Sequence, residues 1–261
     1  MNFIDTHTHL YCDDFDADRT ETLNRCAAAG VTTLFLPAID PETYDRQEEF
    51  VNSLDSDKVN LYQMMGLHPT SVKEDWEQQL AQARQRLFDN PDKYVAVGEI
   101  GLDYYWDRTF EVQQQEVLKE QMRWADQLNL PVALHVRKAY EEILHLLKEL
   151  NLSHYRGVMH CFGGDISQAR RSIDQGFYIG IGGVVTFKNA GMAEVVKAIP
   201  LNRIVLETDS PFLAPVPYRG KRNESAYVVE VAKKIAELKG VSLNEVAEQT
   251  TENARTLFLN R

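Results

Sequence analysis

The chain has 261 residues, of which 44% are hydrophobic and 26% are charged, so it is long enough to bury one large core. Its formal net charge of −11 excludes a broad basic face that would grip nucleic acid through the phosphates. No apolar run approaches the roughly 18 residues of a membrane span, and the N-terminal segment MNFIDTHTHL does not read as a signal peptide.

Short β-rich runs alternate with amphipathic stretches along the chain. The first predicted strand covers residues 3–5, and a helix is expected over 18–29. The following strands are predicted at 31–36, 60–64, 94–97, 132–134, 157–159, 178–181 and 204–206. The following helices are predicted at 41–54, 75–87, 112–127, 139–150, 167–175, 192–198, 226–239 and 243–259. No repeat or linker interrupts the pattern, so residues 1–261 are expected to form a single domain.

Side chains with metal-binding chemistry stand at the ends of most of these strands. They are His7, His9, His68, Glu99, His135, His160 and Asp209. An open parallel sheet would spread these groups along an edge, whereas a barrel gathers all its strand ends around one mouth. The α/β alternation therefore predicts a (β/α)₈ TIM barrel with its site at the carboxyl ends of the strands.

The first strand carries the segment FIDTHTHL. Side chains two residues apart on an extended strand point the same way, so Asp5, His7 and His9 are expected to share one direction. His7 and His9 can then hold one ion between two imidazoles. The alternative is a pair of histidines with partners in a loop or core.

The segment YVAVGEIGLDYY carries an acidic side chain at the end of the fourth strand. Alternation predicts that Val95, Val97 and Glu99 share the inner face of the barrel. A carboxylate among inward apolar side chains is costly unless it is paired or binds a metal. Glu99 is thus a predicted metal ligand, with pairing to an arginine as the alternative.

The fifth and sixth strands end in LPVALHVRKA and RGVMHCFGG. His135 and Arg137 share one face, which indicates a ligand and, one step further out, either an anion contact or a salt-bridging arginine. His160 is the ligand candidate of the sixth strand. Cys161 alternates to the opposite side, so it is expected to be a core thiol.

The last strand, RIVLETDSPFLAP, alternates Glu207 and Asp209 onto the inner face. Two inward carboxylates this close resist ionisation without a cation. Asp209 is therefore a predicted ligand at the mouth. Glu207, one layer below, is expected to orient a ligating imidazole or to make a buried structural hydrogen bond.

Four imidazoles and two carboxylates are enough for two divalent ions if one carboxylate bridges them. We assign the bridge to Glu99. The first ion is then expected on His7, His9, Glu99 and Asp209, and the second on Glu99, His135 and His160. The nitrogen-rich set suits Zn, Mn, Fe, Ni or Co, although Mg, which usually prefers oxygen ligands, stays among the candidates.

Six segments in order over residues 3–224 together resemble the TatD family of metal-dependent hydrolases, within the amidohydrolase-like TIM barrels. They are FIDTHTHL, MMGLHP, VGEIGLDYY, ALHVRKA, GVMHCFGG and LETDSPFLAPVPYRGKRNE. The resemblance implies a (β/α)₈ barrel, a divalent-metal site at the positions named, and hydrolysis of phosphodiester bonds in DNA, commonly as an exonuclease. The chain departs from the family pattern at Gly163, Val136 and Ser225, none of which is an expected ligand.

We therefore expect a deoxyribonuclease of the 3′–5′ exonuclease type that uses a metal-activated water on single-stranded or frayed DNA ends. Asp209 is expected to take the proton of that water, and Glu99 to act with it in the catalytic centre. His68 is expected to donate to the phosphate or leaving group, unless it is a structural histidine in a tight turn.

Substrate contacts are expected from the loop PYRGKRNE and from the segment after Glu99. Arg219 and Arg222, with Lys221, are predicted to meet neighbouring phosphates, unless the loop is merely a solvated basic segment. The aromatic residues 104–106 are expected either to stack on a base, worth roughly 1–3 kcal/mol, or to pack at the barrel rim.

Two rival functions remain open at this point. The same ions activate water against a carbonyl carbon, which would make the protein a deacylase, lactonase or amidase acting on a small ester or amide. A non-enzymatic metal-binding role would require a coordinatively closed site, whereas six ligands shared by two ions leave positions open. We also expect no membrane partner, a monomer, and, because the three cysteines form no CxxC pair, a cytoplasmic location.

Overall fold

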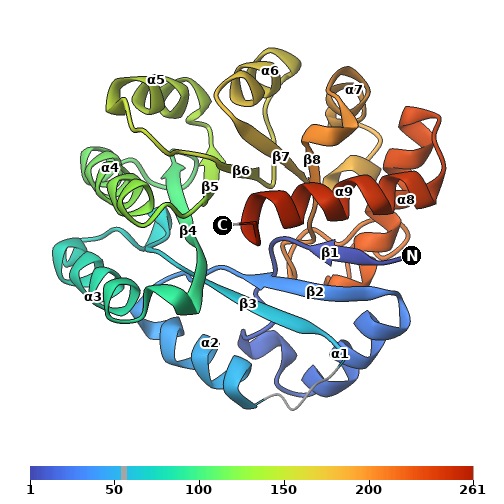
Figure 1. The fold of residues 1–261 in the computed structure, drawn as a ribbon, viewed down its shortest axis with the longest axis horizontal. Coiled ribbons are helices and arrows are strands. Elements are labelled where there is room, and N and C mark those ends of the chain that lie inside the picture. The colour runs from blue at the N-terminus through green and yellow to red at the C-terminus, as the bar shows by residue number, and fades with distance from the viewer. Residues whose placement is uncertain (54–57, 261) are drawn as a thin grey trace.

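Eight parallel strands form one sheet in which each strand pairs with its neighbours in chain order, from β1 to β8. The computed structural model describes residues 1–53 and 58–260. The ring closes where the chain beyond β1 meets the chain beyond β8: Thr8 bridges Ser210, and the Asp209 N–H donates to the His7 carbonyl at 2.9 Å. The predicted (β/α)₈ TIM barrel is confirmed (Figure 1).

The elements follow the predicted alternation. The strands are β1 (Phe3–Asp5), β2 (Val31–Leu36), β3 (Asn60–Met65), β4 (Tyr94–Asp103), β5 (Val132–Arg137), β6 (Gly157–His160), β7 (Phe177–Ile181) and β8 (Ile204–Leu206). The helices are α1 (Arg19–Ala28), α2 (Pro41–Ser53), α3 (Trp76–Asp89), α4 (Glu111–Leu128), α5 (Tyr140–Leu150), α6 (Ile166–Asp174), α7 (Met192–Ala198), α8 (Val228–Lys239) and α9 (Leu243–Phe258).

One boundary differs from expectation in a way that matters for the site. Strand β4 runs on to Asp103 instead of ending at Val97. The predicted helix over 41–54 corresponds to α2, and its last expected residue, Leu54, lies outside the described residues. Within the described residues, no helix is both long and apolar enough to cross a membrane.

Alternate side chains of the strands fill two concentric layers. The barrel interior holds Ile4, Phe35, Met64, Ala96, Ala133, Val158 and Val205. The side chains between them, such as Leu34, Leu134 and Met159, point outward and join the larger cluster beneath the helices. This follows from the two-residue period of a strand, which gives a barrel an inner and an outer face.

The C-terminal helix α9 closes the amino-terminal end of the barrel. Leu257 and Phe258 belong to the interior cluster, and the Phe258 ring centre lies 4.7 Å from that of Phe35. The Asn253 side chain donates to the Ile204 carbonyl at 2.7 Å, where β8 begins. In Figure 1 this red helix crosses the strands near the middle of the view. Only the opposite end, where the strands finish, is left for a site.

Replacing Phe258 with alanine should destabilise the fold without disturbing the carboxyl end. The side chain is 1% exposed, and removing a buried phenylalanine costs about 3–5 kcal/mol. Urea denaturation measures the free energy of unfolding, with the exposed Thr256→Ala in the same helix as the control. A loss below about 1 kcal/mol in Phe258→Ala would contradict the role of α9 as the plug.

Candidate metal centre

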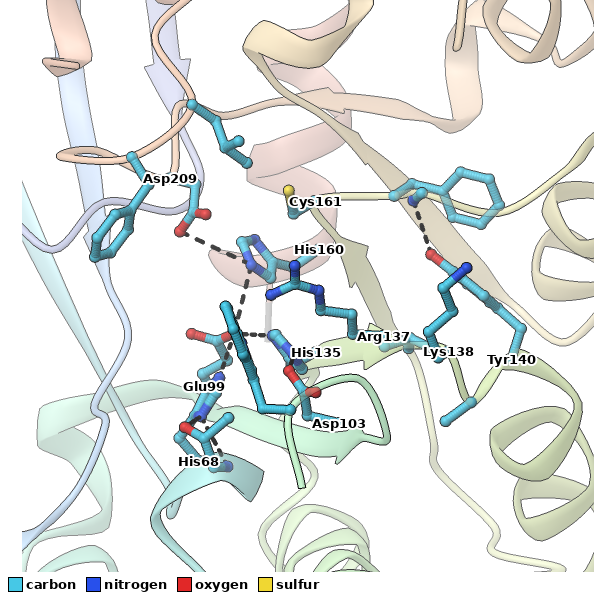
Figure 2. Close-up of a pocket in the computed structure, with 18 of the residues that line it drawn as sticks. His68, Glu99, Asp103, His135, Arg137, Lys138, Tyr140, His160, Cys161 and Asp209 are labelled. Atoms are coloured by element: carbon cyan, nitrogen blue, oxygen red, sulfur yellow. Dashed lines mark hydrogen bonds and ion pairs between the residues drawn. The ribbon is translucent and has the colours of Figure 1, made fainter. Parts of the chain in front are cut away.

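Side chains from separate strand ends converge on a cavity of about 1050 Å³ at the carboxyl end of the barrel. Among the residues lining it are His9, His68, Glu99, Asp103, His135, Arg137, His160, Cys161 and Asp209. In Figure 2 Glu99, His135, His160 and Asp209 extend toward one another from different strands and loops. The predicted ligands are thus brought together.

Glu99 lies at the centre of this cluster and is 2% exposed. Its Oε2 atom is 3.1 Å from His7 Nε2 and 3.6 Å from His9 Nε2. Asp209 Oδ1 approaches the same two nitrogens, at 3.9 Å and 3.6 Å respectively. These four side chains form one half of the centre.

The other carboxylate oxygen of Glu99 faces a different set of imidazoles. Glu99 Oε1 is 2.9 Å from His135 Nδ1, 3.2 Å from His68 Nε2 and 3.4 Å from His160 Nε2. One buried carboxylate therefore presents each of its oxygens to a separate group of ring nitrogens. A ligand that bridges two cations needs this arrangement.

The path of β4 explains how Glu99 reaches the cavity. Val97 packs in the outer cluster, so the prediction that Val95, Val97 and Glu99 share one inner face is wrong. The pairing of β4 with β5 shifts register between Val97 and Ile100. This irregularity breaks the alternation and turns Glu99 inward.

Asp103 is a residue of the site that sequence reasoning missed. Its Oδ2 atom lies 2.9 Å from His135 Nε2, which leaves His135 Nδ1 toward the cavity. The strand reaches this point because Gly101 lets β4 come close to β5: a Cβ there would lie 1.9 Å from the His135 carbonyl oxygen. Strand alternation from Gly101 would have placed Asp103 on the same face, but the fourth strand was expected to end at Val97.

The segment after β1 places the first two histidines. Strand β1 ends at Asp5, so strand alternation does not extend to His7. The prediction that Asp5 shares the direction of the histidines is wrong, because its carboxylate is bound to Thr208 instead. The Asp5 carboxylate instead accepts hydrogen bonds from the Thr208 N–H at 3.0 Å and the Thr208 hydroxyl at 2.6 Å. It also accepts the His7 N–H, at 3.2 Å. Asp5 thereby ties together the two strand ends that carry His7 and Asp209.

Hydrogen bonds set the tautomers of His9 and His160. The Tyr11 hydroxyl donates to the Pro37 carbonyl at 2.7 Å, so it accepts from His9 Nδ1, 3.1 Å away. Glu207 Oε2 accepts from His160 Nδ1 at 3.3 Å. Both rings therefore turn Nε2 toward the cavity, and this is the nitrogen with which each imidazole would bind a metal once it carries no proton.

His68 differs from these two rings. Its Nδ1 accepts the Thr70 N–H at 3.2 Å, so the proton resides on Nε2, which lies 3.2 Å from Glu99 Oε1. This tautomer makes His68 a hydrogen-bond donor inside the cavity.

Four non-glycine residues lining the cavity have left-handed backbone: Lys138, Cys161, Asp209 and Leu213. Each such residue costs of order 1 kcal/mol or more and persists only where its surroundings hold it. At Cys161, with φ of 43°, the turn ends the alternation of β6. The thiol consequently lines the cavity, and the prediction of a core thiol is wrong.

The predicted phosphate contact nearest the centre is Arg137. Its guanidinium carbon lies 3.9 Å from the ring centre of Tyr105 and 5.1 Å from that of Trp106, and the residue lines the cavity. The aromatic faces hold the cation beside the metal-binding side chains by a cation–π interaction.

The two arginines of the loop after β8 lie further out. Arg219 is 4.4 Å from the ring centre of Phe187 and lines a neighbouring hollow. Arg222 pairs with Asp18 at 2.7 Å, so it fastens this loop to the start of α1. Neither residue lines the central cavity.

Burial and the contacts among the clustered side chains shift the pKa values of Glu99, His7 and His160 in different directions. Burial alone would raise the pKa of Glu99, but His68, His7 and His160 hold that pKa well below its usual range. Burial, aided by His160, lowers the pKa of His7. Burial opposes protonation of His160 as well, yet Glu207 and Glu99 raise its pKa to about 10. The cluster is thus built around an ionised carboxylate that attracts positive charge.

The donor set fits divalent cations. His9 Nε2 has a lone pair, and it lies 3.6 Å both from Glu99 Oε2 and from Asp209 Oδ1. His7 Nε2 belongs to the same group of atoms, 3.3 Å from His9 Nε2 and 3.1 Å from Glu99 Oε2. Ligand atoms at bond lengths of about 2.0–2.2 Å from one cation are spaced at similar distances. Imidazole and carboxylate donors suit first-row divalent metals.

A (β/α)₈ barrel with imidazoles and carboxylates buried at its carboxyl mouth is the arrangement found in a class of metal-dependent hydrolases. Residues 4–259 match the family described as TatD related DNase. The chain belongs to the TatD family of metal-dependent hydrolases.

Relatives extend over nearly the whole chain. The "Uncharacterized metal-dependent hydrolase YabD" of Bacillus subtilis is 42% identical over 256 residues, which cover 98% of both chains. YcfH of Escherichia coli K12, with the same description, is 36% identical over 262 residues, covering 99% of this chain and 96% of its own. The crystal structure of YJJV, a TatD homolog from Escherichia coli K12, superposes with a TM-score of 0.91 at 33% identity and covers 99% and 98% of the two chains.

Replacing Glu207 with glutamine should weaken metal binding while the fold persists. Glu207 Oε2 accepts from His160, and its Oε1 accepts the Cys161 N–H at 2.7 Å. A glutamine has one acceptor oxygen for these two donors, and losing a partner of a ligating histidine costs about 10–100-fold in metal affinity. Calorimetric titration with Mn²⁺ measures the metal affinity of the variant and of the parent.

The matched control is Glu224→Gln, because Glu224 is also a buried carboxylate but pairs with Arg25 away from the cavity. Its Mn²⁺ affinity should equal that of the parent. Equal affinities in Glu207→Gln and the parent would show that Glu207 does not orient a ligand.

Proposed function

We propose that the protein is a deoxyribonuclease of the 3′–5′ exonuclease type, acting on single-stranded or frayed DNA ends with two divalent ions. One observation carries the proposal: the two oxygens of Glu99 face separate groups of imidazole nitrogens. Two-metal sites with such a bridge are common among enzymes that hydrolyse phosphodiesters.

The ligands divide between the two oxygens of the bridge. One ion would be held by His7, His9, Asp209 and Glu99 Oε2, and the other by Glu99 Oε1, His135 and His160. Divalent ions bound there lower the pKa of a coordinated water and polarise a phosphoryl oxygen. Asp103 and Glu207 would keep the rings of the second group oriented.

The remaining steps fall to side chains of this chain. Asp209 is the more exposed of the two central carboxylates, with 16% of its side chain accessible against 3% for Glu99. It is therefore the group that accepts the proton of the attacking water. His68 carries its proton on Nε2 inside the cavity, so it donates to the phosphate or the leaving oxygen.

Local groups offset the charge of −11 that would repel DNA. Arg137 contacts the scissile phosphate or its neighbour, and Arg219 in the adjoining hollow extends the basic path. Trp106 and Phe212 line the same cavity and are 71% and 57% exposed, surfaces on which unstacked bases can rest. Arg222 would act indirectly, by fixing the loop that carries Arg219.

The enzyme is also proposed to act as a monomer in the cytoplasm. A single chain supplies the whole cluster, which supports action as a monomer. Cys12, Cys26 and Cys161 are all free thiols, which supports a reducing, cytoplasmic compartment.

Asp209→Asn tests the chemistry. Loss of a general base lowers turnover by about 10²–10⁴-fold, so the variant should release mononucleotides from single-stranded DNA that much more slowly at saturating Mn²⁺. Asp89→Asn, an exposed change at the end of α3, is the control and should match the parent. Turnover at the parent rate in Asp209→Asn would remove Asp209 from the reaction.

A panel of substrates tests the bond that is cleaved. Single-stranded DNA and bis(p-nitrophenyl) phosphate should be hydrolysed in Mn²⁺, and chelation by EDTA should abolish both activities because every proposed step needs the centre. An ester and an amide of similar size should react far more slowly. Faster cleavage of the ester or amide would favour a deacylase, lactonase or amidase instead.

A further inference from the structure

Cys161 is a side chain at the centre that the proposed reaction does not use. We propose that its thiol, with His160 and Asp209, forms the outer edge of the metal centre and gives it a sulfur ligand for thiophilic cations such as Zn²⁺, Co²⁺ and Cd²⁺. The inference rests on the metal centre of the proposed function, and it is independent of which bond the enzyme hydrolyses.

The geometry brings the three groups together. One ligand atom each from His160, Cys161 and Asp209 lies within 4.8 Å of the other two. All three residues line the central cavity. In Figure 2 the sulfur of Cys161 lies near the Asp209 carboxylate and the His160 ring.

The backbone holds the thiol in place. The left-handed turn at Cys161 directs the side chain to the cavity, and the Cys161 N–H donates to Glu207 Oε1 at 2.7 Å. The same glutamate fixes the His160 ring through its other oxygen. A single buried carboxylate therefore positions both the imidazole and the thiol.

Ligand atoms on one cation, at bond lengths of about 2.0–2.3 Å, lie about 3.3–3.8 Å apart. The three ligand atoms lie within 4.8 Å of one another, and rotation about the Cα–Cβ bond of Cys161 moves the sulfur relative to the other two. Binding would add the sulfur to the ion that His160 holds, at the side of the centre that faces Asp209, and would release the thiol proton to solvent.

A sulfur ligand changes which metals the centre prefers. Soft thiolate ligands select Zn²⁺ and similar ions, whereas Mg²⁺ and Mn²⁺ favour oxygen. The other thiols have no such surroundings: among the described residues, no group of potential ligands contains Cys12 or Cys26. The preference for thiophilic metals therefore depends on Cys161.

Cobalt substitution tests the inference by a readout other than activity. Co²⁺ added to the metal-free protein should give visible d–d bands together with a near-ultraviolet charge-transfer band from sulfur to cobalt. Cys161→Ser and Cys161→Ala should keep the d–d bands and lose the charge-transfer band. Cys12→Ser, which changes another half-buried thiol, should keep both.

The outcomes separate the two proposals. A parent spectrum with d–d bands but without a charge-transfer band, or a charge-transfer band that survives in Cys161→Ser, overturns the sulfur ligand and leaves the metal centre standing. If the parent takes up no Co²⁺ in equilibrium dialysis, the metal centre itself fails, and the sulfur ligand falls with it.

Discussion

A carboxylate buried among imidazoles is the interaction on which this structure depends. Glu99 is 2% exposed, and ring nitrogens approach both of its oxygens. A buried anion is stable only where cations or donors surround it. No single segment supplies those partners, because they come from the ends of β1, β3, β5 and β6. Closure of the ring, through Thr8 and Ser210, brings the first and last ligands together, so the metal centre requires the closed barrel.

Stability and chemistry are placed at opposite ends of the barrel. At the amino end, α9 seals the interior with well-packed apolar side chains such as Leu257 and Phe258. At the carboxyl end, left-handed turns at Asp209 and Cys161 direct polar groups into the cavity at a cost in backbone energy. Apolar packing at the amino end offsets this backbone energy. The carboxyl end can therefore keep its left-handed residues and its polar, partly open cavity.

Regular elements were predictable from sequence, and irregular ones were not. Alternation placed His135 at the cavity because β5 pairs regularly with β6. It failed along β4, where the register shift between β4 and β5 sends Val97 outward and Glu99 inward. Such a shift depends on the neighbouring strand, which a local pattern cannot show. Asp103 was missed because β4 was expected to end at Val97, and Cys161 was misplaced because a left-handed turn reverses the direction that strand parity predicts.

The most direct measurement of the central claim is anomalous scattering at the manganese edge from crystals of the protein soaked in Mn²⁺. The account predicts two peaks, one beside each carboxylate oxygen of Glu99, with His9 near the first and His135 near the second. Peaks that do not contact Glu99, or no peak within the cavity, would contradict it.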